Sequence, residues 1–217
     1  MTALRAWFRR VYQRRQNRPV LERVHGTWLL VLPGVLNPRL FRTGAFLAQA
    51  LLGDLIPQGA RVLDMGTGTG VGAVFAARRS DRVLAVDINP AAVRCAQLNA
   101  LLHRLEHKIE VRQSDLFEAL PRERFDVVLF NPPYLKGTPR DAFEGALFSP
   151  DVIARFLTQL PTHLEPNGRA YLLLSTVADL DAILADVRKA GFTIALRAEK
   201  KYFNETLVLF ELRRREV

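Results

Sequence analysis

The sequence Asn-Pro-Pro-Tyr at residues 131–134 follows directly on the apolar run Phe125–Phe130. Two consecutive prolines fix the backbone and remove two amide donors, so the carbonyl of Pro132 and the side-chain oxygen of Asn131 become rigid, converging acceptors. Such a pair suits a donor NH2 group, and the ring of Tyr134 adds a flat face on which an amide or a nucleobase can stack. The motif therefore predicts a site for a planar amino group.

A glycine-rich loop lies earlier in the chain. Residues 64–70 read Asp-Met-Gly-Thr-Gly-Thr-Gly, between an apolar run and a helical pattern. Missing side chains let a ligand approach the backbone amides of such a loop. A tight strand-to-helix turn is the simplest alternative, and a dinucleotide loop is another, although its spacing is G-x-G-x-x-G. The run G-x-G-x-G, with an acid two residues before its first glycine, disfavours the dinucleotide.

Two more acids stand at the ends of apolar runs. Asp87 ends the run after the glycine loop, where a carboxylate can accept both hydroxyls of a ribose. The alternative is an ordinary acid at a strand end. Asp115 follows the third run, where its carboxylate or a neighbouring amide could meet an adenine edge, and where an aspartate could equally cap a helix.

Alternating strands and helices must position these residues. Continuous Val/Ile/Leu runs separated by helical patterns imply βαβ crossovers and a parallel sheet covered on both faces. We predict strands at residues 61–64, 82–87, 109–112, 125–130, 170–175, 192–198 and 206–212, and helices at 43–55, 70–79, 90–102, 151–164 and 179–190. The short link around Asn204 predicts an antiparallel hairpin at one end of the sheet. The expected fold class is α/β, a Rossmann-like, seven-stranded, mostly parallel sheet.

Composition narrows the class of protein. The 217 residues, 49% of them hydrophobic, have room for one domain with a short appendage and exclude general disorder. Apolar stretches such as residues 28–33 are far shorter than the roughly 20 residues of a membrane span. A single cysteine, Cys95, excludes an internal disulfide, and four scattered histidines give no metal pattern. No signal-peptide pattern is present. We expect a cytoplasmic protein without a metal or a membrane partner.

The net charge of +9 is concentrated at the N-terminus. Residues 1–25 hold seven arginines and one acid, Glu22, a net charge of +6 that leaves +3 for the rest. A basic amphipathic helix is predicted there, because apolar residues recur at helical spacing at Leu4, Trp7, Phe8, Val11 and Tyr12. It could dock on the main domain with its arginines in solvent, or contact RNA, ribosome or an acidic protein. We divide the chain into this extension, residues 1–25, and a main domain, residues 26–217.

Together, the glycine loop, Asp87, Asp115 and the Asn-Pro-Pro-Tyr motif resemble a class I S-adenosylmethionine-dependent methyltransferase of the amino-methylating branch. That branch includes N6-adenine methyltransferases and the HemK-like glutamine-N5 methyltransferases of peptide-chain release factors. The resemblance covers about residues 34–212 and is greatest to the small HemK-related enzymes. It implies S-adenosyl-L-methionine as cofactor. It assigns cofactor contacts to Thr43, Asp64, Gly66, Thr67, Gly68, Gly70, Asp87, Ile88, Asp115, Leu116 and Asn131, and catalysis to Asn131, Pro132, Pro133 and Tyr134.

The resemblance also frames the substrate. A glutamine side chain of a protein, such as a release factor, is the first hypothesis, and an adenine of RNA or DNA is the second; a small-molecule amine and a non-catalytic binding module stay open. Two departures from the family pattern bear on this choice. Arg42 stands before Thr43, where family members often carry an acid, and residues 143–150 lack the glycine pair common in release-factor enzymes. The sequence does not define the oligomeric state.

Overall fold

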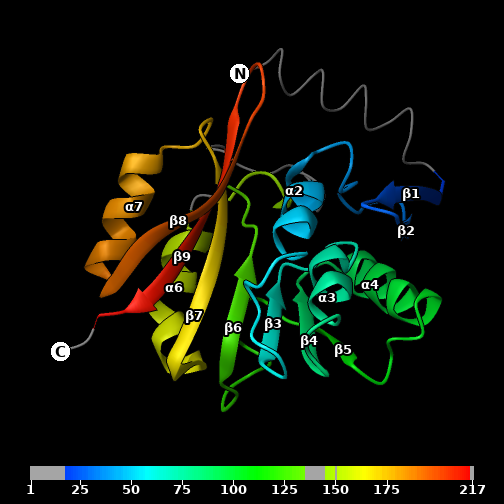
Figure 1. The fold of residues 1–217 in the computed structure, drawn as a ribbon, viewed down its shortest axis with the longest axis horizontal. Coiled ribbons are helices and arrows are strands. Elements are labelled where there is room, and N and C mark those ends of the chain that lie inside the picture. Colours follow the sequence, from blue (N-terminus) through cyan, green and yellow to red (C-terminus); the bar gives the residue numbers. More distant parts are fainter. Residues whose placement is uncertain (1–17, 135–144, 150, 216–217) are drawn as a thin grey trace.

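The computed structural model describes residues 18–134, 145–149 and 151–215 (Figure 1). The predicted amphipathic helix around Leu4–Tyr12 lies outside them, as does most of the segment that follows Tyr134. The first part of the chain forms β1 (Val20–Val24), β2 (Thr27–Val31), α2 (Thr43–Ala50), β3 (Arg61–Met65), α3 (Val71–Ala76), β4 (Arg82–Asp87) and α4 (Pro90–Leu102). The rest forms β5 (Ile109–Gln113), β6 (Phe125–Phe130), α6 (Val152–His163), β7 (Leu164–Ser175), α7 (Leu180–Lys189), β8 (Phe192–Lys201) and β9 (Thr206–Arg214).

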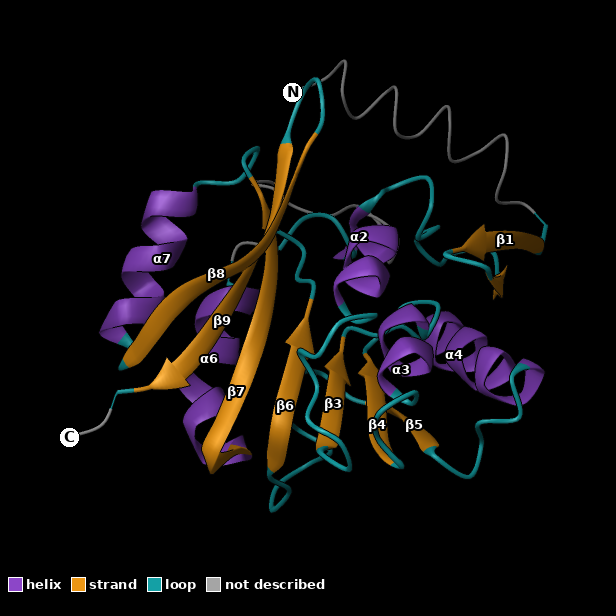
Figure 2. Cartoon of the chain, viewed as in Figure 1, coloured by secondary structure: helices purple, strands orange, loops and turns teal. Residues whose placement is uncertain are grey.

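The described residues contain a seven-stranded sheet with the order β5-β4-β3-β6-β7-β9-β8. Strands β3 to β7 are mutually parallel, whereas β9 runs antiparallel to both β7 and β8. The predicted fold class is confirmed, including the C-terminal hairpin at one end of the sheet. Figure 2 shows helices on both faces.

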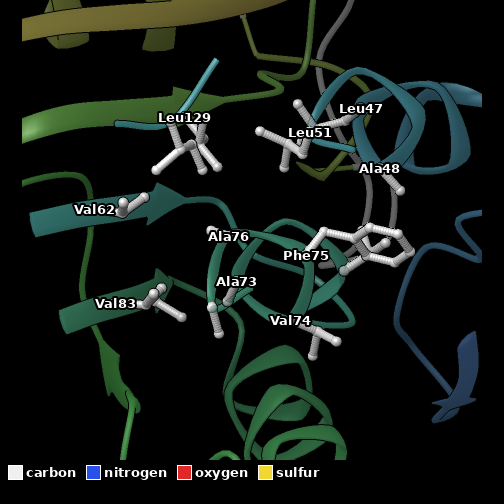
Figure 3. Close-up of a cluster of buried hydrophobic side chains, with 14 of the residues drawn as sticks. Leu47, Ala48, Leu51, Val62, Ala73, Val74, Phe75, Ala76, Val83 and Leu129 are labelled. Atoms are coloured by element: carbon white, nitrogen blue, oxygen red, sulfur yellow. The ribbon is translucent and has the colours of Figure 1, made fainter. Parts of the chain in front are cut away.

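Alternate residues of the strands feed two separate cores, because successive side chains of a strand point to opposite faces. Val62 and Leu129 join the core beneath α2 and α3, with Leu47, Leu51 and Phe75 (Figure 3). Their sequence neighbours Leu63 and Val128 instead join the core beneath α6 and α7, with Phe156 and Val187. Burying each such side chain contributes about 1.5–3 kcal/mol. These two cores fix the strands whose ends carry the predicted site.

A hairpin of β1 and β2 lies outside the main sheet. It turns at His25 and Gly26, both with positive φ, and β1 pairs with β2 from Val20↔Val31 to Val24↔Thr27. Val24 is buried in the core that α2 and α3 share. The predicted division at residue 25 therefore cuts through a hairpin, and residues 20–24 pack with the main domain.

Some predicted boundaries move. Helix α2 ends at Ala50, not residue 55, where Gly53 bonds three residues back to the Ala50 carbonyl. Helix α3 is limited to Val71–Ala76, because Gly70 precedes it with a φ of 80° and Arg79 bonds three residues back to the Ala76 carbonyl. Strand β7 begins at Leu164, earlier than predicted, with a bulge in its pairing to β6. Helix α4 keeps its predicted bounds because Asn89 caps its first turn and Pro90 opens it.

Candidate active site

The predicted site residues gather at the carboxyl ends of the parallel strands, where open α/β sheets bind ligands. Met65 at the end of β3 pairs with Val86 of β4 on one side and Phe130 of β6 on the other. Gly66, Asp87 and Asn131 each come one residue after this row. The glycine loop, Asp87 and Asn131 therefore lie side by side at this edge of the sheet. The carboxyl end of β6 thus lies beside the glycine loop.

Asp64 is buried beneath the glycine loop and organises it. Its Oδ2 accepts hydrogen bonds from Thr67 Oγ1 at 2.6 Å and from the backbone N–H of Ala73 at 2.8 Å. Burial raises the pKa of Asp64 to about 6, although these two bonds lower it. A Cβ on Gly72 would lie 2.4 Å from Asp64 Oδ1. Gly72, which the sequence analysis did not single out, therefore gives the carboxylate its space.

The three loop glycines take the left-handed conformation that side chains disfavour, with φ of 64°, 56° and 80° at Gly66, Gly68 and Gly70. Gly70 has a second constraint, because a Cβ there would lie 3.1 Å from Cα and Cβ of Ala96 on α4. The loop is also fixed by Thr67, whose N–H donates to the Val86 carbonyl at 2.9 Å. Its bare backbone is thereby held at the edge of the sheet.

Asp87 reaches back over the loop from β4. Its Oδ2 accepts from the N–H of Gly68 and its Oδ1 from the N–H of Asn89, both at 2.9 Å. Burial raises the pKa of Asp87, and the amide bonds partly oppose it. Each carboxylate oxygen has a second lone pair for a ligand hydroxyl. The next residue, Ile88, is 62% exposed and offers an apolar surface at the same edge.

Sequence reasoning missed Asn99, the fully buried residue that ties the glycine loop to the β1–β2 hairpin. Its Nδ2 donates to the carbonyls of Thr69 at 2.8 Å and Leu30 at 2.7 Å, and its Oδ1 accepts from the N–H of Leu30 at 2.7 Å. A buried amide needs all these partners to offset its desolvation. The only sequence signal is a polar residue among the apolar residues of α4, which does not reveal its partners.

Asp115 already has a partner on the protein. Its Oδ2 accepts from Arg155 Nη2 of α6 at 2.7 Å, and its side chain is half-buried. Leu116 is buried in the core with a left-handed φ of 50°, a conformation uncommon for a branched side chain. The contact of Asp115 or its neighbouring amides with an adenine edge stays a prediction, and the ion pair favours the amides as the group that makes it.

The side chain of Asn131 is oriented by the start of α2. Its Nδ2 donates to Thr43 Oγ1 at 3.2 Å, a contact between residues 88 positions apart. Because the amide is planar, turning its nitrogen towards Thr43 also fixes the direction of its oxygen, the acceptor that the motif analysis requires. Arg42, the residue before Thr43, has a left-handed φ of 62°. Strain at such a position persists only where surrounding contacts hold it.

Tyr134 is linked to the carboxyl end of the neighbouring strand β7. Its hydroxyl is hydrogen-bonded to that of Ser175, the last residue of β7, and Ser175 Oγ donates to Glu205 Oε2 at 2.7 Å. Burial, together with the negative charge of Glu205, raises the pKa of Tyr134, which stays protonated at neutral pH. Pro132 is buried and Pro133 half-buried between these anchored neighbours. Ser175 and Glu205 carried no motif signal.

The residues present fit S-adenosylmethionine. The glycine loop leaves its backbone open, Asp87 holds spare acceptor capacity for hydroxyls, and the exposed Ile88 can pack on a flat base. Among the described residues, no three His, Cys, Asp or Glu side chains come together as a metal site. The described helices include none long and apolar enough to cross a membrane. A separate cleft of about 490 Å³ between β2, α3 and α4, lined by Trp28 and Arg78, contains no predicted site residue.

Fold and site together define an S-adenosylmethionine-dependent methyltransferase. The chain belongs to the Methyltransferase small domain family, whose model matches residues 28–203. A protein of Methanocaldococcus jannaschii described as a protein N5-glutamine methyltransferase is 33% identical over 158 residues, which cover 68% of this chain and 79% of that protein. The resemblance proposed from sequence is confirmed at the level of the family.

Other relatives are longer than this chain. The release factor glutamine methyltransferase of Koribacter versatilis is 38% identical over 162 residues, covering 66% of this chain and 56% of the relative. The release factor glutamine methyltransferase of Escherichia coli is 40% identical over 130 residues, covering 57% of this chain and 46% of the relative. The chain thus matches about half the length of these two enzymes.

Solved structures show the same fold. The 16S rRNA N2 G1207 methyltransferase of T. Thermophilus, solved with AdoMet and guanosine, has a TM-score of 0.69 at 24% identity and covers 91% of this chain and 50% of its own. The structure of the E. cuniculi Mtq2-Trm112 complex, described as responsible for the methylation of the eRF1 translation termination factor, has a TM-score of 0.63 at 24% identity. The match covers 80% of this chain and 96% of that chain.

Proposed function

We propose that this methyltransferase modifies the side-chain amide of a glutamine in a protein, and that a peptide-chain release factor is the substrate. The observation that carries the proposal is the fixed amide of Asn131, whose nitrogen is held by Thr43 beside the rigid Pro132 carbonyl. The relatives described as glutamine methyltransferases support it. Their substrates belong to translation, so we further propose that this protein acts in the cytoplasm.

The proposed chemistry needs placement more than proton transfer. S-adenosylmethionine, when bound, supplies an electrophilic methyl group; we assign its contacts to the glycine loop, Asp64, Asp87, Ile88, the Asp115–Leu116 segment and Thr43. Asn131 Oδ1 and the Pro132 carbonyl accept the two N–H bonds of the substrate amide from one side, and Tyr134 packs on its plane. This arrangement favours a pyramidal nitrogen and aims its lone pair, because positioning and fixed dipoles supply much of a barrier reduction. No general base is required, since the proton can leave after transfer.

A nucleic-acid substrate is the second candidate. The net charge of +9 favours it, because neutralised phosphates supply affinity that does not depend on sequence. Most of that charge lies in residues 1–25, and the rest of the chain carries only +3. An adenine N6 amino group would use the same two acceptors, so the site chemistry by itself does not separate the two.

The test is transfer of a labelled methyl group from S-adenosylmethionine into separate pools of purified release factor, total cell protein, RNA and DNA. Asn131→Ala serves as the blank in every pool. Label in the release factor, mapped to a glutamine and absent with the variant, supports the proposal. Label confined to RNA or DNA would overturn it and establish the second candidate.

A further inference from the structure

The turn that joins β8 and β9, Tyr202–Glu205, projects beyond the edge of the sheet that carries the candidate site. Figures 1 and 2 show this hairpin extending past the ends of β3, β4 and β6, on the side where α2 begins. The N–H of Tyr202 donates to the carbonyl of Glu205 at 2.7 Å and closes the turn. The turn is therefore closed by a backbone hydrogen bond and lies beyond the sheet edge that carries the substrate motif.

Two adjacent aromatic residues of this turn have opposite environments. Tyr202 is half-buried, with the guanidinium of Arg42 4.6 Å from its ring centroid. Phe203 is fully exposed, with a relative accessibility of 108%. A single exposed apolar side chain is unremarkable on most surfaces. At the tip of a braced turn beside a catalytic site, it is a contact point available to a large substrate.

The turn is tied to both halves of the substrate motif. Glu205 accepts from Ser175, the partner of the Tyr134 hydroxyl, and its Oε1 lies 3.9 Å from Arg42 Nη1. Arg42 precedes Thr43, the residue that orients Asn131. The turn that carries Phe203 is therefore held by the same residues that orient Asn131 and Tyr134, which is the pre-organisation that substrate recognition requires.

The charges around the turn favour a protein as the partner. Lys201 lies 3.8 Å from Glu199, and Arg42 is paired with Glu205. Lys200 is bonded to Gln49 Oε1 at 3.2 Å and lies over the ring of Tyr202. Nucleic-acid affinity needs cations free to neutralise phosphates. Here Arg42 and Lys201 each have a carboxylate partner, Lys200 is bonded to a neutral amide, and the exposed tip consists of Phe203 and the uncharged Asn204.

We propose that the turn Tyr202–Glu205 is a docking element for the protein substrate, with Phe203 packing into an apolar depression near the glutamine that is methylated. The inference rests on the proposed protein-methylating function and adds a specificity-determining residue to it. In this proposal Phe203 contacts the substrate protein away from the reacting glutamine, so it affects the affinity for that protein. The reacting amide is bound by Asn131 and Tyr134.

The experiment is steady-state methylation of purified release factor by wild type, Phe203→Ala and Phe203→Trp. Removing a buried aromatic anchor from an interface typically costs at least tenfold in affinity. We expect the KM for release factor to rise about tenfold in Phe203→Ala, with kcat and the KM for S-adenosylmethionine within about twofold, and Phe203→Trp to recover most of the loss. The matched control is Leu196→Ala, because Leu196 is 52% exposed on the same hairpin but lies away from the turn.

Thermal unfolding separates docking from folding, since an exposed side chain adds little stability. An unchanged KM in Phe203→Ala, with wild type labelling release factor, would overturn the docking inference alone. Failure of wild type to label any protein would overturn the proposed function and this inference with it. A photo-crosslinking phenylalanine at position 203 gives a readout independent of turnover: adducts with release factor support the inference, and adducts with RNA instead overturn it.

Discussion

The half of the sheet that carries the glycine loop and the half that carries the Asn-Pro-Pro-Tyr motif are built by different kinds of contact. In the first half, Asp64 bonds to Thr67 and Ala73, and Asp87 bonds to Gly68 and Asn89, so partners lie within about twenty residues. In the second half, the hydrogen-bonded partners lie 30 to 88 residues apart along the chain. Asn131 bonds to Thr43, and Ser175, the partner of Tyr134, bonds to Glu205.

This difference follows what each half has to do. A small cofactor is the same in every member of the class, so a glycine loop held mainly by nearby carboxylates, with Asn99 tying it to Leu30, suffices to bind it. The substrate side must suit one acceptor, and here it draws on α2, the end of β7 and the β8–β9 turn. The family likeness is therefore informative about the first half, while acceptor choice depends on residues that no short motif contains.

The largest effect is expected at Asn131. In Asn131→Ala, we expect kcat to fall by about a thousandfold, because the substrate amide loses a fixed acceptor in the transition state. Affinity for S-adenosylmethionine, measured by calorimetry, should stay within about twofold. An equal loss of affinity and kcat would contradict the separation of the two halves.

Gly72→Ala tests how tightly the cofactor half is packed. A methyl group there would meet the Asp64 carboxylate at 2.4 Å, so we expect a loss of about 3 kcal/mol in the free energy of unfolding. Gly53→Ala is the control, because a Cβ there makes an ordinary contact at 3.5 Å. Urea unfolding of both variants gives the comparison, and similar stabilities would show that Asp64 does not need this space.

Asp87→Ala should affect the cofactor half alone. Loss of hydrogen bonds from ligand hydroxyls to a carboxylate costs about 2 kcal/mol, or roughly thirtyfold in affinity for S-adenosylmethionine. Asp81→Ala provides the control, since Asp81 is an exposed acid paired with Lys108. Unchanged cofactor affinity in Asp87→Ala would remove the ribose assignment.

Cofactor binding should depend on pH through Asp64. Burial raises its pKa to about 6, so at pH 5 the folded protein holds a proton that an exposed aspartate has lost. A cationic ligand nearby favours the ionised form, so binding releases this proton below pH 6. Affinity should then rise about tenfold from pH 5 to pH 7 and change little above. Asp64→Asn should abolish the slope, and the same slope in that variant would place the titrating group elsewhere.

The smallest effect is expected at Glu205. Glu205→Gln keeps the shape but removes the charge that faces Arg42 and the hydroxyls of Ser175 and Tyr134. We expect kcat/KM for the protein substrate to fall about threefold, as for a partly exposed ion pair. Removing the negative charge should also lower the pKa of Tyr134, which ultraviolet titration of tyrosine can follow against wild type. An unchanged tyrosine titration would argue against a coupling between the turn and Tyr134.

The sequence alone determined the fold class and the succession of strands and helices along the chain. It also located the glycine loop, Asp87 and Asn131 at the ends of strands. It could do so because buried parallel strands are continuous apolar runs and because loop glycines and prolines act through their own backbone. Residues that are close in sequence within one loop are also close in the structure. These features do not depend on which distant residues come to lie beside them.

Only the tertiary structure decided that residues 20–24 pair with β2, that Asn99 clamps the glycine loop, and that Asp115 is paired with Arg155. Only the tertiary structure shows that Thr43 contacts Asn131. It also shows that Ser175 links Glu205 to Tyr134. Each of these contacts joins residues on different elements, and single polar residues carry no periodic signal of their partners. Their pairing is fixed by the packing of the two cores, which is a property of the whole chain.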